Sequence, residues 1–150
     1  MMKAGFALAK ITPPLGTRLS GFGGRDRQKG CEKINDDLYV RILYLHDGSE
    51  EMLIAGFDLL FFAREHADAL KAAVGREMDL SPRQILLNTS HTHSGPCVDR
   101  WGFNMTVLPD MDYLDLVKQA VINSALKAKE SATDVTVWSG AGKTSLPVSR

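Results

Sequence analysis

The sequence is poor in the features that mark several large classes of protein. Its two cysteines, Cys31 and Cys97, form no C-x-x-C pair, so we interpret both as reduced thiols. No run approaches the ~20 apolar residues of a membrane span, and the N-terminus has neither an h-region nor a cleavage site. We therefore expect a cytoplasmic protein without a transmembrane segment.

An excess of charge of either sign is also absent. The 18 Lys and Arg residues balance 18 Asp and Glu residues, and no basic block occurs. This balance gives no reason to expect nucleic acid or an anionic membrane as a partner. At 150 residues and 44% hydrophobic, the chain has ordinary globular composition and the length of one domain.

Several catalytic motifs are missing. The chain has no H-E-x-x-H and no G-x-S-x-G, and its H-x-H pair at 91 and 93 does not continue into H-x-H-x-D-H. The stretch GAGKTS at 140–145 resembles the tail of a phosphate-binding loop, but Val137 stands where the motif requires its first glycine. These absences argue against metallo-β-lactamase, zincin, α/β-hydrolase and P-loop chemistry.

Apolar periodicity predicts an α/β fold, with a mixed β-sheet flanked by helices. Strands are expected at 4–12, 37–48, 51–60, 84–90 and 134–140, and helices at 63–77 and after Asp110. Asp47-Gly48 is a hairpin signal, which joins the second and third strands. The stretch 13–36 is rich in Gly, Pro and charge and is expected to form a long loop over a site.

Two of the four histidines stand where the strand at 84–90 should end, in the stretch NTSHTHSGP. In an extended segment, side chains two residues apart point to the same face, so His91 and His93 should project together. Neutral imidazole is a favoured zinc ligand and a common acid or base. The pair is therefore either a chelating or acid–base unit, or two polar residues on a surface loop.

Asp58 lies near the end of the apolar strand LIAGFDLL, where a lone carboxylate is costly to bury. It either accepts a hydrogen bond from a metal-bound histidine or caps the turn into the next helix. Cys97 is close enough to His93 to be considered as a thiolate ligand, although a small buried thiol explains it as well. His46 and His66 are expected to be solvated bystanders.

Four segments carry a resemblance to a known family. The chain resembles the N-terminal part of the neutral/alkaline ceramidases in AKITPPLGTRLSGFGGR, INDDLYVRILYLHDG, MLIAGFDLL and ILLNTSHTHSGP. These enzymes are zinc hydrolases of sphingolipid metabolism, amidases that release a fatty acid from an N-acyl sphingoid base. The T-H-T-H-[ST]-G-P-type sequence is the most specific element, with Ser90 here in place of the first threonine.

The resemblance implies roles for particular residues. His91 would be a Zn²⁺ ligand, His93 a catalytic residue lining the substrate pocket near the carbonyl, and Gly21 a part of the same pocket. Asp58 would belong to the supporting shell. The substrate would be a small-molecule or lipid N-acyl compound. The chain departs from the family at Lys10, where an acidic residue is common, and after HSGP, where CVDRWGFN replaces a glycine-rich continuation.

The resemblance also implies that residues 1–150 form an N-terminal segment of a longer catalytic domain. The family's enzymes are several hundred residues long and take another His, a Glu and a Tyr for their zinc from later segments. We therefore expect the chain alone to be inert and to self-associate through uncovered surfaces. The alternatives are another metal-dependent amidohydrolase, of the barrel type, or a non-enzymatic binding module whose histidines are structural.

Overall fold

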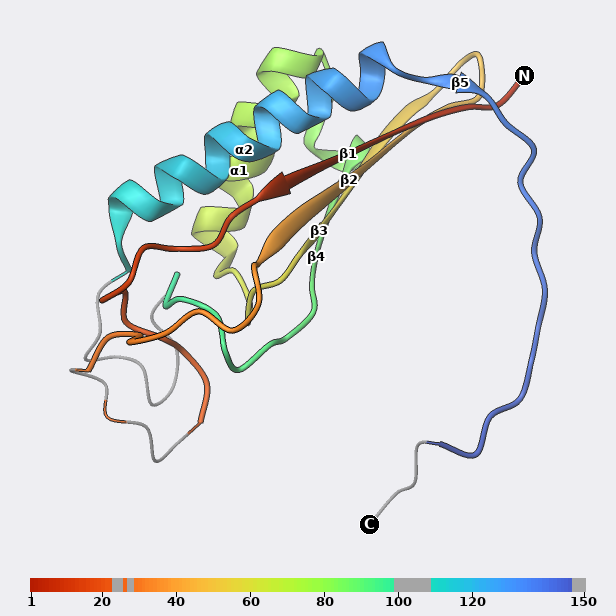
Figure 1. The fold of residues 1–150 in the computed structure, drawn as a ribbon. Coiled ribbons are helices and arrows are strands. Elements are labelled where there is room, and N and C mark those ends of the chain that lie inside the picture. The colour runs from red at the N-terminus through yellow and green to blue at the C-terminus, as the bar shows by residue number, and fades with distance from the viewer. Residues whose placement is uncertain (23–25, 27–28, 99–108, 147–150) are drawn as a thin grey trace.

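The structure is a computed structural model that describes residues 1–22, 26, 29–98 and 109–146. It contains one β-sheet with two helices packed on the same face (Figure 1). The elements in chain order are β1 (Lys3–Lys10), β2 (Tyr39–His46), β3 (Glu51–Phe57), α1 (Arg64–Met78), the 3₁₀ turn η1 (Pro82–Gln84), β4 (Ile85–Thr89), α2 (Met111–Glu130) and β5 (Thr133–Asp134). The predicted α/β class and mixed sheet are confirmed.

The sheet has the strand order β4-β3-β2-β1-β5. β1, β2 and β3 are antiparallel neighbours, and β4 runs parallel to β3 after the crossover through α1. The predicted hairpin lies between β2 and β3, where the Asp47 carboxylate accepts backbone N–H groups of Ser49 and Glu50 at 2.8 Å. These hydrogen bonds lower the pKa of Asp47 to about 2, because they stabilise its charged form.

The core lies between the helices and one face of the sheet. Alternate residues of β2 and β3 point into it, as the period of two requires. Ile42, fully buried, sits opposite Ala7 on one side and Ala55 on the other. α2 lies so close to β1 that a side chain on Gly5 would overlap the carbonyl oxygen of Ala128, so only glycine allows this approach.

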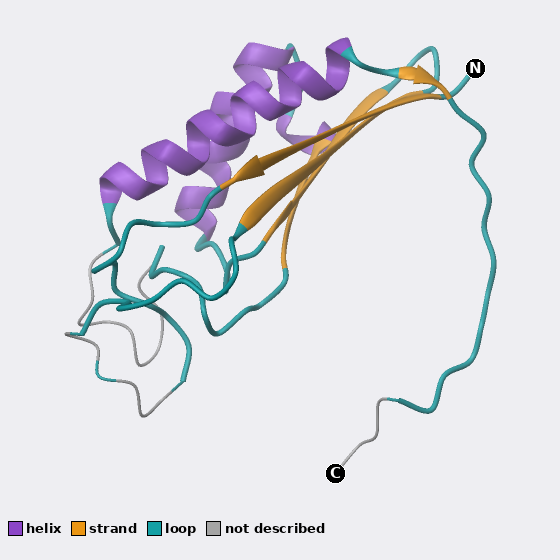
Figure 2. Cartoon of the chain, viewed as in Figure 1, coloured by secondary structure: helices purple, strands orange, loops and turns teal. Residues whose placement is uncertain are grey.

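The opposite face of the sheet carries no helix of the described chain (Figure 2). Phe6, Leu43, Ile54 and Leu86 stand directly opposite one another there and form an apolar row across β1 to β4. Phe6 is 60% exposed and Leu86 is 47% exposed. We call this surface the outer face, and its exposed apolar row is of the kind that marks a contact surface.

Two predicted strands differ from the structure. Within the described part of the chain, β4 is an edge strand rather than a buried one, because it pairs there only with β3 and Ile85 is its one buried residue. The strand expected at 134–140 is reduced to Thr133–Asp134. Asp134 lies opposite Lys3 in an antiparallel register, and the Val135 N–H donates to the Met2 carbonyl at 2.9 Å. Residues 135–146 then continue as an extended tail without strand pairing.

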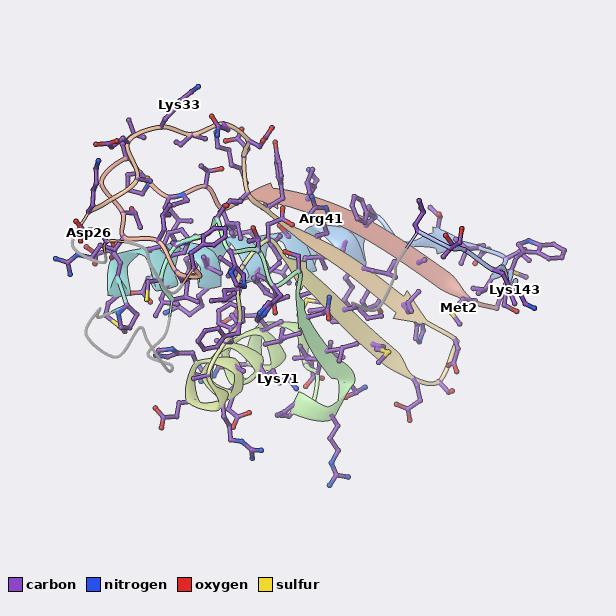
Figure 3. The ribbon with its side chains drawn as sticks, turned by 90° about the horizontal axis from the view of Figure 1, so that it is seen from below. Met2, Asp26, Lys33, Arg41, Lys71 and Lys143 are labelled. Atoms are coloured by element: carbon purple, nitrogen blue, oxygen red, sulfur yellow. The ribbon has the colours of Figure 1, made fainter. Side chains whose placement is uncertain are left out.

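The loop that follows β1 and the segment that follows β4 lie at one end of the sheet, where β1, β3 and β4 terminate (Figure 1). In a view from below, Asp26 and Lys33 mark this end, and Met2 marks the opposite end (Figure 3). Ligands of α/β proteins commonly bind at the carboxyl ends of strands. Neither described helix is long and apolar enough to cross a membrane.

Candidate active site

Two segments far apart in sequence run side by side at this end of the sheet. Leu19 forms an isolated antiparallel bridge with Pro96, and the Ser20 N–H donates to the Gly95 carbonyl at 3.0 Å. The Ser20 side chain is buried and its hydroxyl donates to the Pro96 carbonyl at 3.2 Å. The long loop therefore contacts the histidine motif directly, as its composition predicted.

The two histidine rings lie together, with centroids 5.2 Å apart and an edge-on arrangement. The predicted proximity is confirmed, but its geometric reason is wrong. His91 has φ 59°, in the left-handed region, so the segment is not extended there. His91 follows the end of β4, and its left-handed backbone, rather than an extended one, brings its ring next to that of His93.

The His91 ring is held by the backbone. Its Nδ1 lies 3.0 Å from the carbonyl oxygen of Leu60. A carbonyl oxygen can only accept, so this hydrogen bond requires the proton on Nδ1 and leaves the lone pair of the neutral ring on Nε2. Histidines that bind metals are commonly oriented by such a contact.

The His93 ring is also held by the backbone, but its Nδ1 accepts a hydrogen bond instead of donating one. Its Nδ1 accepts a hydrogen bond from the backbone N–H of Phe22 at 3.3 Å, and the Phe22 ring meets it edge-on with centroids 5.3 Å apart. An accepting Nδ1 places the proton of the neutral ring on Nε2. The pair thus combines an Nε2 lone pair on His91 with an Nε2–H on His93.

Gly21 lies against His93. A Cβ atom built on Gly21 would stand 2.6 Å from the Cβ of His93, and φ at Gly21 is 79°. Both the close approach and the left-handed backbone exclude a side chain here. Gly21 therefore adjoins His93 and lets the loop approach the histidine.

Asp58 binds neither histidine, nor does it cap α1. Its carboxylate accepts from the Arg41 guanidinium at 2.9 Å and from the Tyr39 N–H at 3.0 Å, and Arg41 also lies over the Tyr39 ring. The N-cap of α1 is Ala63, which has no side-chain cap bond. The orienting contact for His91 comes from a carbonyl group instead, so the structure does not bring Asp58 to the pair.

The described residues do not supply a complete metal site. No group of three His, Cys, Asp or Glu side chains gathers within the ranges that the structure describes. Cys97 is buried, His46 lies at the far end of β2, and His66 lies on α1. His91 fits the donor type that zinc requires, but structural and catalytic zinc sites use three or four protein ligands.

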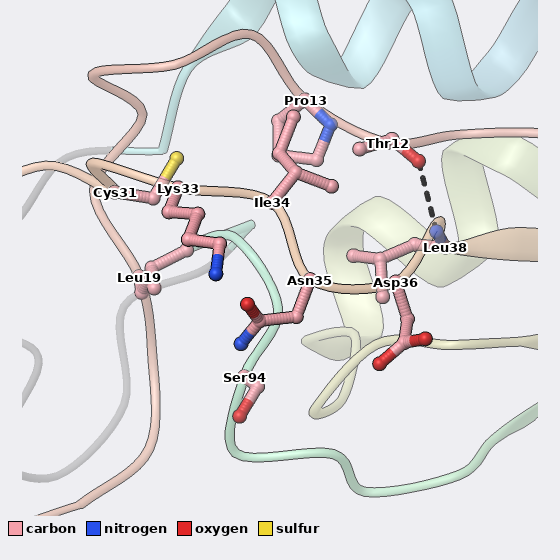
Figure 4. A pocket seen from close by; sticks show the side chains of 10 residues that line it. All are labelled: Thr12, Pro13, Leu19, Cys31, Lys33, Ile34, Asn35, Asp36, Leu38 and Ser94. Carbon is pink, nitrogen blue, oxygen red and sulfur yellow. Dashed lines mark hydrogen bonds between the residues drawn. The ribbon is translucent and has the colours of Figure 1, made fainter.

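A pocket of about 290 Å³ adjoins the histidine motif (Figure 4). Ser94, next to His93, forms part of its wall, and Leu19 enters from the long loop. The other lining side chains come from the ends of β1 and β2 and from the loop between them: Thr12, Pro13, Cys31, Lys33, Ile34, Asn35, Asp36 and Leu38. The pocket combines apolar walls with several polar groups, as ligand sites do.

Comparison with known proteins gives matches at the level of structure. No family model and no curated protein matches the sequence. The fold is similar to a neutral ceramidase from Pseudomonas aeruginosa, with a TM-score of 0.75, 16% identity, and coverage of 87% of this chain and 22% of that one. A ceramidase complexed with C2 gives a TM-score of 0.66, 16% identity, and coverage of 87% and 21%.

These matches establish a ceramidase-like fold for the chain. The chain spans only about a fifth of the length of those two proteins. The sequence predicted an α/β fold like the N-terminal portion of a ceramidase. The match to a part of a neutral ceramidase agrees with that fold.

Sequence reasoning missed three contributors to the site. Phe22 follows Gly21 in the quoted SGFG stretch, and its position beside a glycine that the resemblance assigns to the substrate pocket is the signal that could have found it. Ser20 in the same stretch is a small polar residue whose burial the pattern did not reveal. The Leu60 carbonyl has no sequence signal, because every residue carries a carbonyl group.

Proposed function

We propose that the chain forms part of a zinc-dependent amide hydrolase acting on N-acyl compounds, as in the ceramidases that it resembles. The observation that carries the proposal is the pair His91 and His93, whose rings are fixed with complementary Nε2 groups beside Gly21. The ceramidase-like fold supports the same reading. The substrate is a small-molecule or lipid amide, and nucleic acid has no part in the proposal.

The proposed roles follow from the proton positions. His91 offers its Nε2 lone pair as one zinc ligand, held in place by the Leu60 carbonyl. A bound zinc supplies Lewis acidity and a water acidic enough to ionise near neutral pH. His93 offers a proton on Nε2, suited to stabilising the negative charge on the amide oxygen or to protonating the leaving amine.

The proposal includes a division of the site between chain segments. Residues 1–150 supply His91 and the substrate-facing groups, and the remaining zinc ligands come from chain outside the described residues. Asp58 supports the site by hydrogen bonds to Arg41 and Tyr39 at the start of β2, rather than by a bond to a histidine. We also propose that the protein acts in the cytoplasm.

The test combines metal analysis with hydrolysis assays. The purified chain, supplied with zinc, should bind it weakly and leave N-acyl substrates of several chain lengths intact, since three protein ligands are the usual minimum for a zinc site. A longer protein that contains the chain should bind about one zinc and release a fatty acid, and a chelator should abolish that activity. Robust chelator-sensitive hydrolysis by the 150-residue chain would show that the proposed ligand division is wrong. A metal-free, inactive longer protein would favour a binding module with structural histidines.

A further inference from the structure

The pocket next to the histidine motif has fixed walls. On one side, the Cys31 N–H donates to the Thr17 carbonyl at 2.9 Å, and the Gly16 N–H donates back to the Cys31 carbonyl at 2.9 Å. On the other side, the Thr12 hydroxyl donates to Asp37 and accepts the Leu38 N–H, both at 2.8 Å. The segment between Cys31 and Leu38 is therefore tied at both ends by hydrogen bonds.

Two charged side chains, Lys33 and Asp36, line the pocket, and two ion pairs lie close to them in the sequence. Lys10 lies 2.8 Å from Asp37, which lowers the pKa of Asp37 and raises that of Lys10 through their mutual hydrogen bond. Lys29 lies 3.0 Å from Glu32. Lys33, which lines the pocket, has no carboxylate partner among the residues that the structure describes. It is the cation available to a ligand.

The directions of the side chains decide which charge a ligand meets. Lys33 and Asn35 extend from the loop toward the side on which Ser94 lies (Figure 4). Asp36 turns the opposite way, so its carboxylate is directed away from Lys33. One ammonium, one amide and one hydroxyl thus face the same space, and all three can donate hydrogen bonds to an anion.

We propose that this pocket binds the carboxylate of an anionic N-acyl compound, of the N-acyl amino acid class. Lys33 supplies the charge, Asn35 and Ser94 supply hydrogen bonds, and Pro13 and Ile34 form the apolar wall. The inference rests on the proposed amide hydrolysis for its biological meaning. Ser94, the residue after His93, lines the pocket. A substrate whose amide lies at His93 would then place a nearby carboxylate at Lys33.

The reaction that this substrate would undergo is balanced by water alone. The amide C–N bond breaks, the water oxygen bonds to the acyl carbon, and the two water protons are shared between the products. The products are a fatty acid and an amino acid. A neutral ceramide-like amide has no group that would require the ammonium of Lys33.

The experiment measures binding to the chain by NMR, so it does not depend on hydrolysis. The probes are N-octanoylglycine and its homologues with longer spacers, neutral N-octanoylethanolamine, and cationic N-octanoylethylenediamine. We expect an anionic probe to shift the backbone signals around Lys33, Asn35 and Ser94, and the neutral and cationic probes to bind more weakly there. Lys33→Met should lower the affinity for the anionic probe about fivefold, the size expected for a partly exposed ion pair. The matched control is Lys29→Met, on the same loop but paired with Glu32 and outside the pocket lining.

Each outcome decides the proposal. Equal binding of the three probes, tighter binding of the cationic one, absence of binding, or an unchanged affinity in Lys33→Met would overturn it. Selective anionic binding by a chain whose longer form hydrolyses no amide would retain the pocket assignment and reject the hydrolase. Hydrolysis of neutral amides without any binding preference at Lys33 would retain the hydrolase and reject the pocket assignment.

Discussion

The carbonyl oxygen of Leu60 lies 3.0 Å from Nδ1 of His91, and the same oxygen accepts the Thr89 hydroxyl at 3.2 Å. Leu60 itself is buried, so this acceptor is held by the core rather than by solvent. The turn that follows β3 thereby fixes a ring at the end of β4. This relationship carries the expectation that the exposed His91 ring is oriented as a ligand by its Nδ1 contact.

His91→Ala removes the Nε2 lone pair and should strip zinc from a longer protein that contains this chain. We expect metal content to fall below about a tenth of an equivalent and turnover to fall at least about 100-fold, because the site loses one of its protein ligands. Metal analysis and an amidase assay measure both. His46→Ala, at the opposite end of β2, is the matched control. Full zinc and normal turnover in His91→Ala would refute the ligand assignment.

His93→Ala should lower turnover while leaving most of the metal in place. Loss of one donor to a developing oxyanion typically lowers kcat by about 100-fold or more. The distinguishing measurement is the ratio of metal content between the His93 and His91 variants. Equal loss of zinc in both would mean that both rings are ligands, and the division of roles would be wrong.

Gly21→Ala should displace His93, because the new Cβ would stand 2.6 Å from the histidine Cβ. Gly16→Ala is a close control, since Gly16 also has a left-handed φ, at 87°, but has no atom within 4 Å of the added carbon. We expect the control to cost about 1 kcal/mol from backbone strain alone. Only Gly21→Ala should also lower activity and shift the NMR signals of His93. Identical behaviour of the two variants would place Gly21 in an ordinary loop.

Tyr113→Phe should destabilise the fold by about 1–3 kcal/mol, the usual penalty for leaving a buried acceptor unsatisfied. The Tyr113 hydroxyl donates to the Ile11 carbonyl at 2.7 Å, and burial raises the pKa of the phenol, which keeps the donor protonated. Urea unfolding at neutral pH measures the change. Tyr39→Phe, on the outer face, should change stability by less than about 0.5 kcal/mol. A smaller effect of Tyr113→Phe than of the control would contradict the assigned bond.

The outer face should drive self-association of the isolated chain. Phe6→Lys combined with Leu86→Lys places a charge at each end of the apolar row, so the dimer fraction should fall at a given concentration. Light scattering after size exclusion gives the mass. Leu126→Lys, on the exposed side of α2, is the control and should leave the mass unchanged. An unaltered mass in the double variant would assign association to another surface.

The sequence by itself determined what depends on neighbours along the chain. The period of two in YVRILYLH placed alternate residues of β2 in the core, and Asp47-Gly48 placed the turn. Apolar spacing placed Val117 and Val121 on the buried side of α2, and Asp110 caps that helix, accepting the Tyr113 N–H at 3.1 Å. The position of the histidine pair at a strand end followed from the same patterns, since periodicity and turn chemistry act within a few residues.

Tertiary structure decided everything that depends on which segments meet. Asp58 could bind several partners by sequence, and the β2–β3 register gave it Arg41. The approach of Gly21 to His93 joins residues more than 70 positions apart, and a left-handed φ at His91 replaced the extended geometry that spacing implied. β5 pairs with the first residues of β1, a register that its composition does not indicate. Local propensity cannot fix such outcomes, because long-range packing and pairing select among conformations that differ little in local energy.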